Sequence, residues 1–116
     1  MAIFAIRLLP EELRSLAFGS LSTSYAAVGS GFINPIRIFH LQNLTDANIV
    51  YSFDGVTDHG VIAAGSFLLL DVTANKTIVD GEFISRGTVI SVATIAGETA
   101  VSTGNVYLSV FYGASK

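Results

Sequence analysis

The densest group of side chains capable of chemistry lies at residues 54–59, DGVTDH. It places two carboxylates and an imidazole close together, and such groups can ligate a divalent cation. The spacing does not match the alternating Asp or Asn residues of a calcium loop. Zinc sites normally use three or four thiolate or imidazole ligands, whereas the chain has two histidines and no cysteine. We therefore expect a solvated loop; the alternatives are a weak metal site and a loop that contacts a partner through Asp54, Asp58 and His59.

The remaining polar residues do not form a recognisable catalytic pattern. His40 has no Asp or Glu nearby in the sequence to orient it and no accompanying nucleophile motif, which favours a structural or interface histidine. Glu11 and Glu12 are interpreted as helix-end electrostatics, and the glycines at residues 29–31 lack the further glycines, the lysine and the helix of a phosphate loop. We expect a protein that is not an enzyme and that uses no cofactor.

The composition is unusually poor in charge. Hydrophobic residues make up 51% of the 116 residues and charged residues 13%, against roughly 25% charged in an average soluble domain. The mean hydropathy is +0.62. The longest apolar runs, such as residues 67–70, are far shorter than the roughly 18 residues that span a bilayer, so we expect no membrane segment. A domain of this size and composition is expected to bury apolar surface against other chains, as an oligomer or an assembly subunit.

The charges that are present do not suggest nucleic acid as a partner. The net charge is −3, and the six basic residues are scattered without a stripe for a phosphate backbone. Residues 1–13 contain only a short apolar stretch with no basic residue before it, unlike a signal peptide. We expect a chain made in the cytosol and not exported through a cleaved signal.

The elements that position these residues are predicted to be strands. Residues 36–43 alternate with a period of two, which is typical of a strand. Asn, Asp and Thr at residues 43–48 favour a turn, and a second strand follows at residues 49–53, so the pair predicts a β-hairpin. The alternation puts one set of side chains on one face and the other set on the opposite face: Ile36, Ile38, His40 and Gln42 against Arg37, Phe39, Leu41 and Asn43.

Further strands are expected along the rest of the chain. The segment at residues 66–72 is apolar on both faces and is predicted to lie in the middle of a sandwich. The other predicted strands are residues 24–28, 61–62, 88–95 and 105–112 and a short one at Ile84. About seven or eight strands with turn signals between them predict an all-β fold, an antiparallel β-sandwich of jelly-roll-like form.

The N-terminal part has a different pattern. Residues 2–9 fit a strand or an extended arm, and Pro10, followed by two acidic residues, is typical of a helix start. We expect one short helical turn before Gly19. This divides the chain into an arm at residues 1–20 and a β-sandwich domain at residues 21–116.

Three stretches of the chain resemble small structural proteins of tailed bacteriophage particles: IRIFHLQNLTDANIVYSFDG, FLLLDVTANKT and VYLSVFYGA. The similarity covers about residues 13–115 and consists of strand and turn residues. It implies a β-sandwich of the virion, made in the host cytoplasm, without a particular place in the particle. The matching elements are Gln42-Asn43, Thr45, Ser52-Phe53-Asp54-Gly55, Leu70-Asp71 and Asn75-Lys76.

The resemblance and the composition together lead to one main hypothesis and two alternatives. The first is a capsid decoration (cement) protein that binds neighbouring shell subunits in many copies, as a homo-oligomer such as a trimer. The second is a head–tail connector, ring or tail-fibre adaptor subunit, and an alternative of another class is a glycan-binding module that uses the loops at residues 54–60 and 96–104. In the decoration hypothesis, the N-terminal arm contacts a neighbour through Phe4, Ile6, Leu8, Leu9 and Leu13.

Overall fold

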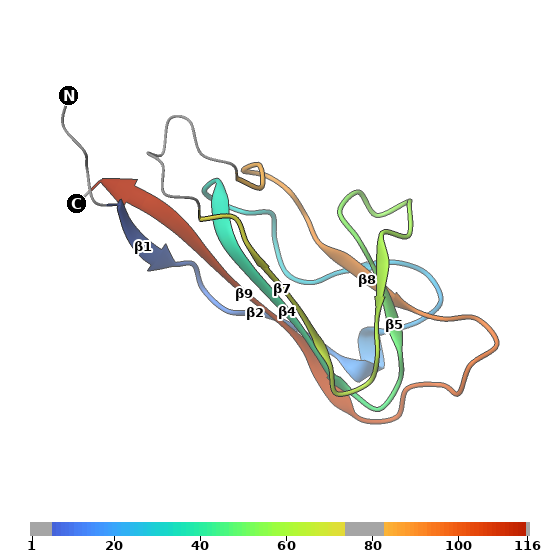
Figure 1. The fold of residues 1–116 in the computed structure, drawn as a ribbon. Coiled ribbons are helices and arrows are strands. Elements are labelled where there is room, and N and C mark those ends of the chain that lie inside the picture. The colour runs from blue at the N-terminus through green and yellow to red at the C-terminus, as the bar shows by residue number, and fades with distance from the viewer. Residues whose placement is uncertain (1–5, 74–82, 116) are drawn as a thin grey trace.

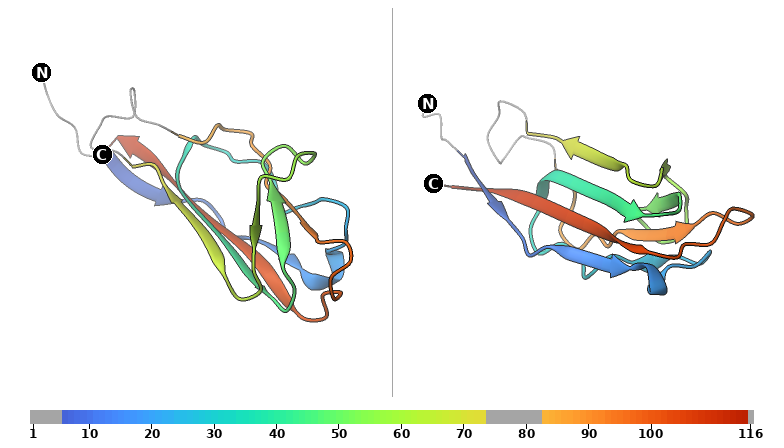
Figure 2. Two further views of the ribbon diagram at one scale, coloured as in Figure 1. Left: turned by 45° about the vertical axis from the view of Figure 1, so that its right-hand side comes forward. Right: turned by 90° about the horizontal axis from the view of Figure 1, so that it is seen from below.

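The computed structural model describes residues 6–73 and 83–115. They form two antiparallel sheets that pack face to face, as Figures 1 and 2 show. The larger sheet has the strand order β1-β9-β4-β7, with β2 also paired to β9, and the smaller sheet has the order β3-β8-β5-β6. The expected antiparallel β-sandwich is thereby confirmed, while its jelly-roll form stays a prediction.

The larger sheet contains the long strands of the molecule. Its strands are β1 (Ile6–Pro10), β2 (Arg14–Ala17), β4 (Ile36–Thr45), β7 (Phe67–Asp71) and β9 (Gly104–Ser115). The smaller sheet consists of β3 (Ala26–Ala27), β5 (Ile49–Ser52), β6 (Gly60–Ile62) and β8 (Ser91–Thr94). A short 3-10 helix, η1 (Phe18–Ser20), follows β2.

The core lies between the two sheets and is built from every second residue of the strands that face it. In β9 the burial alternates: Val106, Leu108 and Val110 are buried, whereas the residues between them are partly exposed. Strands β4, β5 and β8 add their own inward-facing residues. Complete burial of one such side chain stabilises the fold by roughly 1.5–3 kcal/mol. The central residues of the core are Phe39, Leu41, Ile49, Val92, Val106, Leu108 and Val110.

A β-bulge in β4 changes which side chains share a face. Ile36 pairs with Tyr112 and Ile38 pairs with the adjacent Phe111, so Arg37 is an extra residue in β4. The bulge reverses the alternation, and Ile36 lies fully buried in the same core as Phe39. The prediction that Ile36 shares a face with Ile38 and His40 is therefore wrong, because sequence periodicity does not reveal an inserted residue.

The predicted hairpin at residues 35–54 is also wrong, although both of its strands exist. Strand β4 pairs with β7 and β9 in the larger sheet, whereas β5 pairs with β6 and β8 in the smaller one. The connection between them is an arch that crosses from one sheet to the other. Asn43 holds this arch: its buried amide donates to Ala47 O at 2.8 Å and to Ile62 O at 3.0 Å, and its Oδ1 accepts a hydrogen bond from Thr45 Oγ1 at 2.6 Å.

Strand β7 lies at the end of the larger sheet's strand order, not in the middle of the sandwich. Its residues alternate between exposed and partly buried, with Leu68 and Leu70 packed against the core. The prediction of burial on both faces is wrong because the outward-facing residues of this strand are apolar as well. Of the shorter predicted strands, residues 24–28 contain β3, residues 61–62 lie within β6, and Ile84 forms an isolated bridge to Ile36.

The N-terminal residues belong to the larger sheet. Strands β1 and β2 both pair with β9, and no helix starts at Pro10, which is the last residue of β1. A helical turn does exist in this part of the chain, but it is the 3-10 helix η1 at residues 18–20. Residues 6–17 of the expected arm are therefore strands, residues 1–5 lie outside the described residues, and the boundary after residue 20 stays a prediction.

The molecule is elongated, with extents of 57 × 23 × 20 Å. Its radius of gyration is 15.5 Å, against about 13 Å for a compact domain of this length. Strands β4 and β9 have 10 and 12 residues, whereas the strands of the smaller sheet have at most 4, so the larger sheet extends beyond the smaller one. Figure 2 shows this extension on the side where β1 and the end of β9 lie.

Candidate functional site: the outer face of the larger sheet

The face of the larger sheet that points away from the core carries large apolar side chains on four neighbouring strands, with uncharged polar residues between them. The strand register places its residues in rows, and in one row His40 of β4 lies between Leu69 of β7 and Ser109 of β9. The next rows have the same order of strands. They are Phe67–Gln42–Tyr107 and Asp71–Ile38–Phe111, and β1 adds Leu8 and Pro10.

Several large hydrophobic side chains on this face are exposed. Phe67 is 60% exposed, Leu69 54%, Leu44 48% and Leu8 44%. The His40 and Phe67 rings form a T-shaped pair with 5.1 Å between the ring centroids, so the histidine packs against this apolar surface. We call this set, the outward-facing residues of β1, β4, β7 and β9, the outer face. Exposed apolar surface gathered on one sheet face is typical of a contact with another molecule.

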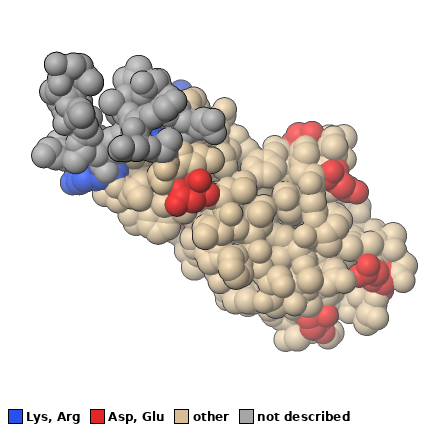
Figure 3. Space-filling view, in the orientation of Figure 1, with Lys and Arg blue, Asp and Glu red and all other residues tan. Residues whose placement is uncertain are grey.

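Charge is nearly absent from the outer face. Among the described residues of the outer face, Asp71 is the one with a charged side chain. Hydrogen bonds from the Thr73 hydroxyl and backbone N–H lower the pKa of Asp71, and the nearby Arg37 charge adds to this effect. Figure 3 shows large uncharged areas on the side of the molecule in view, with isolated acidic residues between them.

The residues expected to contact a partner from the N-terminal arm are not all on this face. Leu8 belongs to it, because its pairing partner in β9 is Gly113. Leu9 pairs with Tyr112 and faces the opposite side, and Leu13, 56% exposed, lies in the connection between β1 and β2. Ile6 begins β1, and Phe4 lies outside the described residues.

The two most exposed large hydrophobic residues of the outer face, Phe67 and Leu69, were not among the residues predicted to contact a partner. The signal was present, because the segment at residues 66–72 is apolar at both odd and even positions. That pattern fits a strand buried by the protein's own core on both sides, and it fits equally a strand with one face left for a partner. Only the sheet order, which places β7 at one end, separates the two interpretations.

The acidic loop at residues 54–59 follows β5 in the smaller sheet, away from the outer face. Asp54 accepts hydrogen bonds from Val56 N and Thr57 N, both at 2.8 Å, and from Ser52 Oγ at 2.7 Å. These hydrogen bonds favour the charged carboxylate and hold the pKa of Asp54 well below its usual range. The carboxylate is therefore used to form the turn.

The other acidic residue of this loop and its histidine also have partners within the protein. Asp58 accepts a hydrogen bond from the Tyr25 hydroxyl. Desolvation, followed by the Asp58 hydrogen bond and charge, raises the pKa of Tyr25 to about 12. His59 Nδ1 accepts a hydrogen bond from Phe53 N at 3.0 Å. Within the described ranges, no group of three or more His, Asp or Glu side chains is placed to hold a metal ion.

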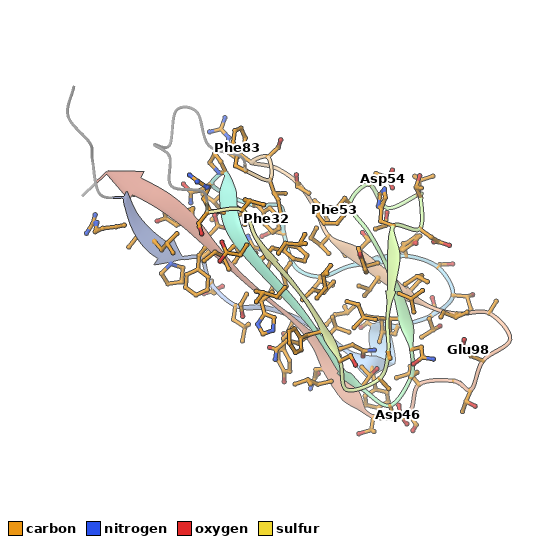
Figure 4. All side chains as sticks on the ribbon, viewed as in Figure 1. Phe32, Asp46, Phe53, Asp54, Phe83 and Glu98 are labelled. Atoms are coloured by element: carbon orange, nitrogen blue, oxygen red, sulfur yellow. The ribbon has the colours of Figure 1, made fainter. Side chains whose placement is uncertain are left out.

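A second polar cluster lies at the other end of the smaller sheet, as Figure 4 shows for Asp46 and Glu98. Asp46 accepts hydrogen bonds from the hydroxyl of Ser102 and from its backbone N–H at 2.9 Å, and Asn48 donates to Glu98 at 3.1 Å. A hollow of about 400 Å³ is lined by Asp46, Asn48 and Glu98 together with their neighbours in the chain. These hydrogen bonds fasten the loop at residues 95–103 to the arch. The polar residues of the cluster therefore have a structural role.

The buried pair of Glu11 and Arg14 is a polar site that the sequence analysis interpreted wrongly. Their side chains are 3% and 7% exposed and form an ion pair at 2.9 Å. Arg14 also donates to Ser30 O at 2.9 Å and Gly31 O at 3.1 Å, and Glu11 accepts from Asn34 N at 2.9 Å. The pair fastens the connection between β1 and β2 to the loop before β4. Its role is therefore structural and not the helix-end electrostatics that was expected.

Comparison of the chain with protein-family models, with curated proteins and with solved structures gave no match. In the part of the chain that the structure describes, no helix has the length and apolar character needed to cross a membrane. The most distinctive surface feature of the described residues is the outer face.

Proposed function

We propose that the protein is a non-enzymatic structural subunit of a bacteriophage particle, in the form of a capsid decoration protein. Copies of the chain associate through the outer face of the larger sheet, and the resulting oligomer binds the shell. The observation that carries the proposal is the exposed apolar surface of that face, centred on Phe67 and Leu69.

A second copy of the chain is the binding partner that best matches the outer face. The face has one charged residue, Asp71, so it lacks the charge pattern with which a partner of opposite charge would be selected. An apolar patch that avoids charge is self-complementary, as a symmetric contact between copies requires. The low charged fraction of the whole chain, 13%, is in keeping with a subunit that buries surface in an assembly.

The proposal that this subunit belongs to a phage particle is based on the resemblance of its strand and turn residues to small phage structural proteins. The polar clusters also support a structural role. The carboxylates of Glu11, Asp46 and Asp54 bind backbone N–H groups of the protein itself, so they serve the fold.

The decisive test is the incorporation of a variant into particles. In phage grown with the chain carrying Leu69→Glu, we expect loss of the protein from purified particles, because the glutamate places a charge in the centre of the outer face. Val61→Glu is the matched control: Val61 is 61% exposed and lies on the outside of the smaller sheet. Equal incorporation of both variants would contradict the role of the outer face.

Copy number then separates a decoration protein from a head–tail adaptor. Quantitative mass spectrometry of purified particles is expected to give hundreds of copies, because decoration follows the symmetry of the shell. About 6 or 12 copies would instead indicate a ring at the neck or tail. Complete absence of the chain from particles would overturn the proposed function.

A further inference from the structure

The β-bulge of β4 buries the side chain of an arginine, Arg37. Arg37 is 5% exposed, and among the residues that the structure describes its Nε has no hydrogen-bond partner. A guanidinium keeps its positive charge in proteins, and a buried charge without a partner is costly. Natural structures usually satisfy such groups, so an exception calls for an explanation.

The other buried arginine shows the usual solution. Arg14 donates to Glu11 and to three backbone carbonyl groups, and its guanidinium also lies 5.2 Å from the centre of the Phe32 ring. Among the described residues, Asp71 is the acid whose pKa the Arg37 charge lowers, but its Oδ1 is engaged by Thr73, and the Glu11–Arg14 pair is the only ion pair. Arg37 therefore has no carboxylate bound to it within this part of the chain.

Arg37 lines a pocket of about 370 Å³ together with Pro35, Phe83 and Gly113. The pocket lies at the extended end of the larger sheet, where Figure 4 shows Phe83 close to the start of β4. Its size is within the range of small-ligand sites, and apart from Arg37 its described wall is apolar. An apolar wall strengthens the attraction between the guanidinium and an anion, because it keeps water away from both.

From this combination we propose that the Arg37 pocket binds a carboxylate attached to an apolar group. The guanidinium matches the two oxygens of a carboxylate with two parallel N–H donors, and Pro35 and Phe83 contact the apolar group. A single positive charge balances one carboxylate, whereas a phosphate dianion would leave a negative charge in the pocket. The source is either a free organic acid or an acidic side chain of a neighbouring subunit.

Benzoate and acetate are the probes for the isolated chain, tested against chloride at equal ionic strength. Saturating benzoate is expected to raise the Tm by at least about 2 °C and to shift the backbone amide NMR signals of Phe83 and Gly113. Acetate should act more weakly because it lacks the apolar group, and inorganic phosphate should have no effect beyond that of chloride. An equal response to phosphate and benzoate, or no response to any of the three, overturns the proposal.

Variants assign the effect to Arg37. Arg37→Gln is expected to lose the benzoate response, while Arg86→Gln, which removes the same charge from an exposed turn, keeps it. If Arg37→Gln does not fold, Phe83→Ala replaces it, and its benzoate affinity should fall at least threefold while its acetate affinity is unchanged. Equal losses in Arg37→Gln and Arg86→Gln would indicate general charge attraction and contradict the site.

Two further experiments distinguish the sources of the carboxylate. If a neighbouring subunit supplies it, benzoate should compete with self-association of the chain and lower the oligomer mass; if a free acid supplies it, the mass should not change. Asp80 and Glu82 are acids of the chain itself that lie outside the described residues. A benzoate response that appears only in the double variant Asp80→Asn/Glu82→Gln would overturn the proposal.

Discussion

The buried ion pair between Glu11 and Arg14 shows how single residues determine the path of the N-terminal strands. Because both side chains are almost completely buried, each depends on the other and on the backbone groups of residues 30–34 for its hydrogen bonds. Gly29 is required beside them: it has φ +74°, and a Cβ at this position would lie 2.7 Å from Arg14 Cγ. The loop and the pair therefore form one unit.

Removal of one partner of this pair is expected to be costly. We predict that Arg14→Met lowers the free energy of unfolding by about 3–5 kcal/mol, because it leaves the Glu11 carboxylate buried without its cation. The double variant Arg14→Met/Glu11→Gln should lose less than the sum of the two single variants. Urea denaturation measures all three, and strictly additive losses would show that the two residues act independently.

The same carboxylate predicts a dependence of stability on pH. Burial raises the pKa of Glu11, but hydrogen bonds from Asn34, Arg14 and Ile33 outweigh this effect, so that its pKa is below the usual 4.5. The folded state therefore releases the proton more readily than the unfolded state. The resulting stability is present above pH 4.5 and is lost as the pH falls through the folded-state pKa.

A comparison with Glu11→Gln isolates this contribution from the other carboxylates. Asp46, Asp54 and Asp71 also have lowered pKa values, so the wild-type protein loses stability in acid for several reasons. The stability advantage of wild type over Glu11→Gln should shrink as the pH falls below 4.5. Urea denaturation at a series of pH values measures it, and a difference that stays constant in acid would contradict the assignment.

At the scale of elements, the arch between β4 and β5 decides the architecture. A hairpin would have kept both strands in one sheet, whereas the arch sends β5 into the other sheet. Asn43 and Thr45 make this possible: they face inward at the end of β4 and bind the backbone groups that the arch would otherwise leave unsatisfied.

Loss of the Asn43 side chain is therefore expected to weaken the whole sandwich. We predict that Asn43→Ala lowers the free energy of unfolding by about 2–4 kcal/mol, because the buried carbonyl groups of Ala47 and Ile62 lose their donor. Asn48→Ala is the control on the same arch; the hydrogen bonds of Asn48 are exposed, and about 1 kcal/mol or less is expected. Equal losses in the two variants would contradict the role of Asn43.

The elements also show which parts of the fold the sequence could predict. Alternation in residues 36–43 correctly predicted a strand and placed Phe39, Leu41 and Asn43 on one face, because local geometry sets a period of two. Partner strands were not predictable in this way, since a period of two says which face is buried and not which strand lies alongside. The extra residue at Arg37 and the contact of Glu11 with Asn34 depend on tertiary structure and left no local signal.

The sequence predicted the apolar character of the candidate site but not its location. The excess of apolar residues correctly indicated unburied hydrophobic surface, and Leu8 was among the residues expected to contact a partner. Its main location, Phe67 and Leu69, was missed because the strand order was unknown. The acidic loop at residues 54–59 was the most noticeable polar cluster in the sequence, but its hydrogen bonds show that Asp54 supports the turn.

At the scale of the whole molecule, the larger sheet has apolar residues on both faces, and the residues that the structure describes cover only one of them. The elongated shape increases this effect, because β4 and β9 extend the outer face along much of the molecule. The free energy available from covering such a surface comes from the removal of apolar area from water, about 25 cal/mol per Å². Association driven in this way differs from association driven by charge in its response to salt.

We therefore predict that the purified chain self-associates and that 1 M NaCl does not dissociate the oligomer. At this salt concentration the Debye length falls to about 3 Å, so contacts between exposed charges are screened, whereas an apolar contact is not. Sedimentation equilibrium at several protein concentrations measures the mass. Leu69→Glu should give a monomer at concentrations where wild type and Val61→Glu are oligomers, because a charge buried in the apolar contact costs several kcal/mol. A wild-type chain that is monomeric throughout, or an oligomer that high salt dissociates, would show that the outer face is not the contact between copies.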